Sequence, residues 1–138
     1  MSMKPAALAL VAAAVLPVGC GSQSSPETAA QHVTLGWHDK GRSLSIARGS
    51  IVVLKLDSVY WRVQGSSDRD VVSPTGQIEQ KPAPSGTCVA GGGCGTTTAR
   101  FRAVGAGTAH LRAARSSCGE VLRCTGGRGR YDVTIRVS

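Results

Sequence analysis

The amino-acid sequence predicts an all-β protein, and the clearest evidence is an alternation of apolar and polar side chains in its last third. Three runs show this alternation, at residues 98–104, 109–113 and 131–137. Successive side chains along a strand point to opposite faces, so a period of two is typical of strands with one buried and one exposed face. A tight turn at residues 105–107, of sequence GAG, is expected between the first two runs.

Shorter strands are expected earlier in the chain. Apolar residues alternate around 33–35 and again around 44–46, with a turn at 38–41 between them. Residues 50–56 are a denser apolar run, which is typical of a strand that is covered on both faces or lies centrally in a sheet. Trp61 follows this run and is predicted to point into the core.

The middle of the chain is more polar. Residues 66–80 are predicted to hold one short strand at Val71 and Val72, and residues 81–97 to form a long Gly- and Pro-rich loop. No stretch has the periodicity, cap and length of a helix. Short strands at regular spacing with Gly-rich turns indicate a sandwich or a barrel, and residues 32–138 have the length of an immunoglobulin-like β-sandwich.

The segment before Cys20 is predicted to be a lipoprotein signal peptide, spanning residues 1–19, rather than part of the fold. Lys4 precedes an apolar run at 6–18, which is shorter than the ~20 residues that a membrane-spanning helix needs. The small residue before Cys20 resembles a bacterial lipobox, in which the cysteine is acylated and becomes the N-terminus, although Pro17 stands where Leu is usual. The alternative is ordinary cleavage near the alanines, which would leave a soluble secreted protein.

The number of cysteines favours lipidation of Cys20 together with two disulfides. The chain has five cysteines, and the other four form an even set: Cys88, Cys94, Cys118 and Cys124. An even set in an exported protein suggests disulfides. Local pairing, Cys88 with Cys94 and Cys118 with Cys124, is preferred because glycines bend freely inside the first ring. Cross-pairing would close longer loops and gain ~1 kcal/mol more for each bond, which is too little to decide between the two.

Residues 20–31 are predicted to be a flexible tether, because they have no periodicity and too little apolar surface to fold. A lipid on Cys20 would then hold the domain at 32–138 outside the cytoplasm, anchored to the cell membrane. The chain carries 16 Lys and Arg against 8 acids, a formal net charge of +8. Nucleic-acid binding is not expected, since the chain is exported, its arginines are spread along outward strand faces and no aromatic interleaving offers a stacking platform for bases.

The sequence predicts neither an enzyme nor a metal protein. No serine has the G-x-S-x-G context of a nucleophile, and His110 lies on the outward face of a predicted strand. Glu120 is expected to pair with Arg115 or Arg123 rather than to act as a base. Zinc sites favour closer cysteine pairs than these two. No cofactor is expected either, because no helix follows the glycines at 91–95 to complete a phosphate site.

The order of turns and strands carries a family resemblance. Its landmarks are Arg48-Gly49-Ser50 followed by Val52 and Leu54, then Tyr60-Trp61, then Gly93-Cys94-Gly95 followed by Phe101-Arg102-Ala103, and finally Gly107-Thr108-Ala109-His110-Leu111. With these landmarks, residues 33–137 resemble the chagasin family, bacterial and protozoan inhibitors of papain-like cysteine peptidases. The resemblance implies an immunoglobulin-like fold with two layers of strands.

The resemblance also implies a binding end. In that family three loops at one end of the sandwich enter the peptidase cleft, and here they correspond to residues 57–60, 91–95 and 115–118. The first loop keeps the Tyr of an NPTTGY-like pattern, and the third keeps the Arg of an RPW-like pattern. The candidate partner-binding residues are Asp57, Ser58, Val59, Tyr60, Gly91, Gly92, Gly93 and Arg115.

Two departures from the family pattern affect the expected function. Ser116 and Ser117 replace the Pro and the aromatic residue of the third loop, and the second loop gains Cys94. The resemblance therefore implies an inhibitor of papain-like peptidases that is weaker than well-matched members. The alternatives are a non-inhibitory envelope lipoprotein that binds another protein or an envelope component, and a purely structural envelope protein.

Overall fold

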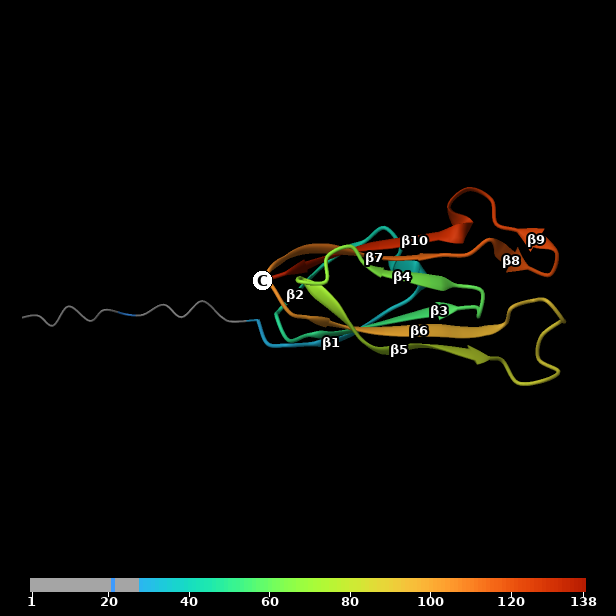
Figure 1. Ribbon diagram of the computed structural model, residues 1–138, viewed down its shortest axis with the longest axis horizontal. Coiled ribbons are helices and arrows are strands. Elements are labelled where there is room, and N and C mark those ends of the chain that lie inside the picture. The colour runs from blue at the N-terminus through green and yellow to red at the C-terminus, as the bar shows by residue number, and fades with distance from the viewer. Residues whose placement is uncertain (1–20, 22–27) are drawn as a thin grey trace, which may run out of the picture.

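The computed structural model describes residue 21 and residues 28–138, which form two four-stranded β-sheets packed face to face (Figure 1). The predicted signal peptide at 1–19, the predicted acylation site Cys20 and most of the predicted tether at 20–31 lie outside the described residues. The described part of the tether is fixed at its end, because the Gln31 amide donates to Ser50 Oγ at 3.0 Å. The first strand starts at the next residue.

The two sheets are built from eight strands, with a small two-stranded ribbon beside them. The elements are β1 (His32–Leu35), η1 (Trp37–Asp39), β2 (Ser43–Ile46), β3 (Ile51–Asp57), β4 (Arg62–Ser66), β5 (Val72–Pro82), β6 (Gly95–Ala103), β7 (Gly107–Ala114), β8 (Ser117–Gly119), β9 (Leu122–Arg123), η2 (Gly126–Gly129) and β10 (Arg130–Val137). One sheet has the order β1-β3-β6-β5, the other β2-β10-β7-β4, and β8 pairs with β9. In the described part of the chain, no helix is long and apolar enough to cross a membrane.

The core lies between the sheets and is formed by the residues that the alternation predicts. In β3 the side chains of Val52, Leu54 and Leu56 are completely buried, and β3 lies between β1 and β6 as expected for a central strand. Trp61 is also completely buried, which confirms its predicted orientation. The same pattern in β10, with every second residue buried, confirms the last predicted strand and the all-β sandwich.

The prediction was wrong for the polar middle of the chain. Instead of a short strand at Val71 and Val72, β5 is an eleven-residue strand that pairs with β6, and the irregular segment is limited to 83–94. β5 is an edge strand, and all its residues after Val72 are partly or fully exposed, so no alternation of burial marks it in the sequence. A shift in register between Thr75 and Glu79 interrupts its pairing with β6.

The predicted local disulfides are confirmed. Cys88 is bonded to Cys94 and Cys118 to Cys124, and each bond closes a ring within one connecting segment. Both rings lie at the same end of the sandwich, whereas the start of β1 and the C-terminus lie at the other end (Figure 1). The chain therefore enters the fold far from its cysteine-bearing loops.

Candidate functional site

Three connecting segments that are far apart in the sequence meet at one end of the sandwich (Figure 1). They are the β3–β4 link at 58–61, the β5–β6 loop at 83–94 and the β7–β10 segment at 115–129. The strand ladders fix their positions, because β3 pairs with β6 up to Asp57 and Thr96, and β7 pairs with β10 up to Ala114 and Arg130. We call this end of the molecule the loop end.

The β3–β4 link is held against the β5–β6 loop by its backbone. The Ser58 amide donates to the Gly95 carbonyl at 2.8 Å, and the Val59 amide donates to the Gly93 carbonyl at 3.0 Å. Ser58 has a φ of 124°, a conformation that non-glycine residues seldom adopt. Its carbonyl accepts a buried hydrogen bond from Thr97 Oγ1 at 2.8 Å, which helps to keep it there.

Tyr60 and the predicted glycines of the β5–β6 loop form one contact. The Tyr60 hydroxyl donates to the Gly91 carbonyl at 2.7 Å. The tyrosine ring lies so close to Gly93 that a Cβ at this position would overlap its Cδ2 and Cε2 atoms. Gly93 also has a φ of 68°, so both the space and the backbone require glycine. The structure thus brings the first two predicted loops together as one rigid edge.

Gln80 is a member of this edge that sequence analysis missed. Its side-chain amide donates to the Val59 carbonyl at 2.8 Å and to the Trp61 carbonyl at 3.1 Å, so it braces the link from the other side. Gln80 lies in β5 opposite Thr97. No sequence signal marks it, because its role depends on the register of a strand that the pattern does not reveal.

Arg115 packs on a pair of tryptophans. Its guanidinium carbon lies 4.4 Å from the centre of the Trp61 ring and 5.9 Å from that of Trp37, and the two rings are 5.6 Å apart. The expected ion pair between Glu120 and Arg115 or Arg123 does not occur among the described residues. The guanidinium of Arg115 is held over the two tryptophan rings instead. Arg115 therefore anchors the base of the third segment to the core.

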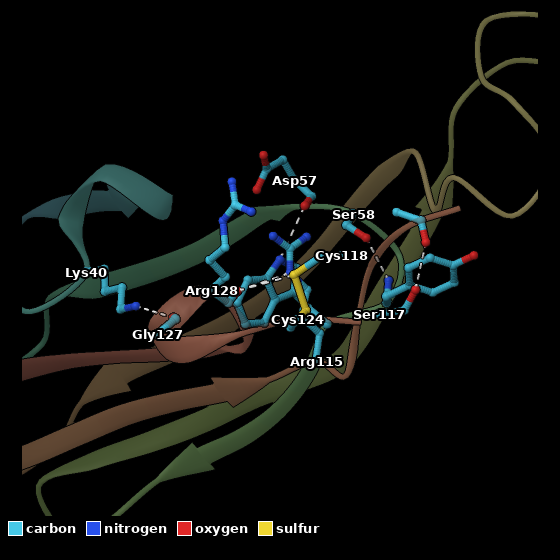
Figure 2. Close-up of a disulfide and its surroundings, with 12 residues drawn as sticks. Lys40, Asp57, Ser58, Arg115, Ser117, Cys118, Cys124, Gly127 and Arg128 are labelled. Carbon is cyan, nitrogen blue, oxygen red and sulfur yellow. Dashed lines mark hydrogen bonds between the residues drawn. A yellow bond between two sulfur atoms is a disulfide. The ribbon is translucent and has the colours of Figure 1, made fainter. Parts of the chain in front are cut away.

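Backbone contacts fix the rest of this third segment. The Arg115 amide donates to the Gly129 carbonyl at 2.9 Å, and the Cys124 amide donates to the Ser116 carbonyl at 2.9 Å. The Lys40 ammonium donates to the Gly127 carbonyl and tethers η2 to the body of the fold. Figure 2 shows the Cys118–Cys124 disulfide beside Arg115 and this lysine contact.

The β3–β4 link at 58–61 and residues 91–95, which contact it, form what we call the braced edge. A shallow pocket separates the braced edge from the third segment. It has a volume of about 190 Å³ and is lined by Val59, Tyr60, Arg62, Gln80, Ser116 and Ser117. Ser116 and Ser117, which stand at the Pro and aromatic positions of the RPW-like pattern, both line this pocket.

Three exposed aliphatic side chains at the loop end were also missed. Val89 is 65% exposed in the first disulfide ring, and Val121 and Leu122 are 100% and 63% exposed in the second. The sequence could have indicated this exposure, because a short disulfide ring is too small to bury an apolar side chain within it. These side chains give the loop end apolar tips.

A charged cluster of His110, Arg112 and Asp132 lies on the strands β7 and β10 rather than in the connecting segments of the loop end. His110 Nδ1 and Arg112 Nε each contact one carboxylate oxygen of Asp132 at 2.8 Å, on the outward face of β7 and β10. Burial raises the pKa of the Asp132 carboxyl, but the hydrogen bonds from His110 and Arg112 outweigh it and hold this pKa below its usual value. Among the described residues, no three His, Cys, Asp or Glu side chains are grouped so as to hold a metal ion.

Comparisons with known proteins identify the fold. No family model and no curated protein matches the sequence. Amebosin matches with a TM-score of 0.51 and 15% identity over 78% of this chain and 98% of that one. EhICP2, a cysteine protease inhibitor from Entamoeba histolytica, matches with a TM-score of 0.54 and 10% identity over 78% and 97%. The chain has the chagasin-like fold.

A third structure, PbICP-C in complex with falcipain-2, aligns over 79% of this chain and 98% of that chain, with 13% identity and a TM-score of 0.41. The chagasin-like fold confirms the immunoglobulin-like sandwich that the landmarks implied. The predicted loops at 57–60, 91–95 and 115–118 lie together at the loop end (Figure 1).

The contact between Gly93 and Tyr60 predicts a large effect of a single methyl group. We expect Gly93→Ala to destabilise the fold, because the new Cβ overlaps the tyrosine ring and because the φ is positive. Gly86→Ala is the matched control, since Gly86 has a similar φ of 82° and no atom near the new Cβ. Urea unfolding should show a loss of about 1 kcal/mol for the control, from backbone strain. It should show about 1–3 kcal/mol more for Gly93→Ala, from overpacking. Equal losses would contradict the contact.

The packing of Arg115 on Trp61 predicts that this arginine stabilises the protein without any partner. We expect Arg115→Gln to lower the free energy of unfolding by about 1–2 kcal/mol, because a cation on an aromatic face is lost. Arg136→Gln, on an exposed arginine of β10, should change it by less than about 0.5 kcal/mol. Denaturation followed by tryptophan fluorescence measures both, and a loss no larger than that of the control would disprove the role.

Proposed function

We propose that this chain is an extracytoplasmic inhibitor of papain-like cysteine peptidases, which its loop end blocks. The observation that carries the proposal is the braced edge, in which the backbone of Ser58 and Val59 is hydrogen-bonded to Gly95 and Gly93. This edge presents backbone and a half-buried Tyr60 on a rigid support. Such preorganisation lowers the entropy cost of binding. The chagasin-like fold, which EhICP2 shares as a cysteine protease inhibitor, supports the same conclusion.

The braced edge is also a poor substrate. A peptidase cleaves an extended segment that adapts to its cleft, but Ser58 has a φ of 124° and Gly93 one of 68°. The amides of Ser58 and Val59 already donate within the protein, so they are not available to pair with the walls of a cleft. Cleavage would require these bonds to break first, which favours a bound, uncleaved complex.

The position of the start of β1 is compatible with anchoring by a lipid on Cys20. The start of β1 lies at the end of the sandwich opposite the loop end (Figure 1). A lipid and a tether attached there would leave the loop end facing away from the membrane. In this arrangement a peptidase outside the cytoplasm reaches the loops without obstruction.

A second candidate is a non-inhibitory envelope lipoprotein that binds another protein. The observation that favours it is the pocket lined by Ser116 and Ser117, where the third loop lacks bulk. A loop end without that anchor would still be rigid and apolar at its tips. Pull-down from envelope extracts, together with the inhibition assay below, separates the two candidates.

The inhibition proposal predicts that the peptidase cleaves the inhibitor slowly or not at all. The full chain, purified in its oxidised form, should inhibit at least one member of a panel of papain-like peptidases and remain intact by mass spectrometry. The missing aromatic anchor should weaken binding by at least about thirty-fold relative to well-matched family members. Gly93→Ala should inhibit less well than Gly86→Ala. No inhibition at high micromolar concentration would rule out the inhibitor function.

The anchoring proposal predicts that fatty-acid labelling distinguishes the unaltered chain from Cys20→Ala. In bacterial cells supplied with labelled palmitate, the unaltered chain should take up label and fractionate with membranes, because two acyl chains anchor a protein stably. Cys20→Ala should take up no label. Cys88→Ala is the control, since Cys88 is already bonded to Cys94 and should leave labelling unchanged. Label in the Cys20→Ala chain would disprove acylation at this residue.

A further inference from the structure

The β8–β9 ribbon exposes apolar side chains that nothing in the fold explains. Val121 and Leu122 stand at its tip and are 100% and 63% exposed. No described residue covers Val121 in the free protein. An isolated exposed valine is ordinary, but two adjacent aliphatic side chains at the tip of a rigid loop are a feature of interaction sites.

The backbone at the tip makes this exposure more unusual. Val121 has a φ of 48°, in the left-handed region, which β-branched residues rarely adopt. Glycine or asparagine would suit this position better on both conformational and solvation grounds. Valine at this position costs stability on both grounds and contributes nothing to the core.

The tip is held in place before any partner arrives. The Cys118–Cys124 disulfide closes the ribbon, and Ser117 pairs with Arg123 across it. The Ser117 hydroxyl donates to the Gly119 carbonyl at 3.0 Å. A pocket of about 330 Å³ lies beside the tip, lined by Ser116, Ser117, Val121, Leu122 and Arg123. The ribbon is therefore a preformed projection with a hollow at its side.

We propose that Val121 and Leu122 form an apolar knob that enters an apolar, carboxylate-rimmed pocket on the peptidase, beside its cleft. The inference rests on the proposed inhibitor function and assigns the anchoring role of the missing aromatic residue to these two side chains. The knob and the two serines, Ser116 and Ser117, line the same pocket. The knob therefore lies next to the positions at which the family pattern has Pro and an aromatic residue. A filled pocket of this kind is what makes an interface residue a hot spot.

The charge around the knob defines the rim of the partner's pocket. Arg123, Arg128 and Arg130 are exposed in this segment, and Glu120 is the one acidic residue between 115 and 130. A partner with carboxylates around the apolar pocket complements this charge. A second copy of the chain would instead bring two arginine clusters together. A membrane is disfavoured as well, because the knob lies at the end of the sandwich opposite the start of β1 (Figure 1).

Val121→Asn tests the knob without damaging the fold. Asparagine is similar in size, accepts the left-handed backbone and is polar, so the melting temperature of the full chain should stay the same or rise. Inhibition of the peptidase should weaken by about tenfold or more, as for loss of a buried apolar anchor. Leu122→Gln should weaken it similarly. Val104→Asn is the matched control, because Val104 is 40% exposed outside the loop end and should leave inhibition unchanged.

The outcomes separate this inference from the proposed function. If the unaltered chain inhibits and both knob variants inhibit equally well, the knob is overturned and the inhibitor function stands. If the unaltered chain inhibits no peptidase, both are overturned. Arg123→Glu should weaken inhibition most at low salt, and no change would overturn the acidic rim. Binding of the Cys20→Ala chain to anionic phospholipid vesicles, abolished by Val121→Asn, would assign the knob to a lipid surface and overturn its role in the peptidase complex.

Discussion

The ladder between β3 and β6 is the interaction on which the rest of the loop end depends. Its buried side chains, Val52, Leu54 and Leu56, fix the register that places Asp57 opposite Thr96. The backbone pairing then continues past the last ladder residue, through the amides of Ser58 and Val59. Because these two amides donate to the first residue of β6, Gly95, and to Gly93 in the loop before it, a core strand and a surface loop become one rigid unit. The position of the loop is thus set by the burial of apolar side chains farther along the same strand.

A second joint, at Trp61, links this unit to the opposite sheet. The Trp61 indole donates to the Asp57 carbonyl at 3.3 Å, and its ring carries the guanidinium of Arg115 from the end of β7. The Trp37 ring packs against the same ring at a tilt of 40°, and the Lys40 ammonium lies 4.8 Å from the centre of the Trp37 ring. Two aromatic rings and two cations therefore hold together segments from both sheets. Movement of the third segment relative to the braced edge would have to break these contacts, which explains how the long segment between β7 and β10 keeps a defined position.

The parts of the structure that sequence alone predicts are those with a local signal. Alternation in β6, β7 and β10, the denser run of β3, the inward Trp61 and the pairing of neighbouring cysteines all follow from residues close in the chain. β5 was missed because all its residues after Val72 are partly or fully exposed, and such a strand has no alternation of burial. The packing of Arg115 on Trp61 was missed because it joins residues brought together only by the two sheets. At the loop end, Tyr60 and Gly93 were predicted as neighbours of a partner. Their contact with each other became visible only with the register of β3 and β6.

The four edge strands of the two sheets affect how this protein associates with other proteins. β1 and β2 are four residues long, and β4 and β5 are interrupted by shifts in register after Val63 and Thr75. β5 also contains Pro74 and Pro82, which lack an amide hydrogen. Short or bulged edges do not template another strand, so the sheets resist growing by edge-to-edge association. On a crowded surface, neighbouring copies would then stay separate, and recognition is left to the loops.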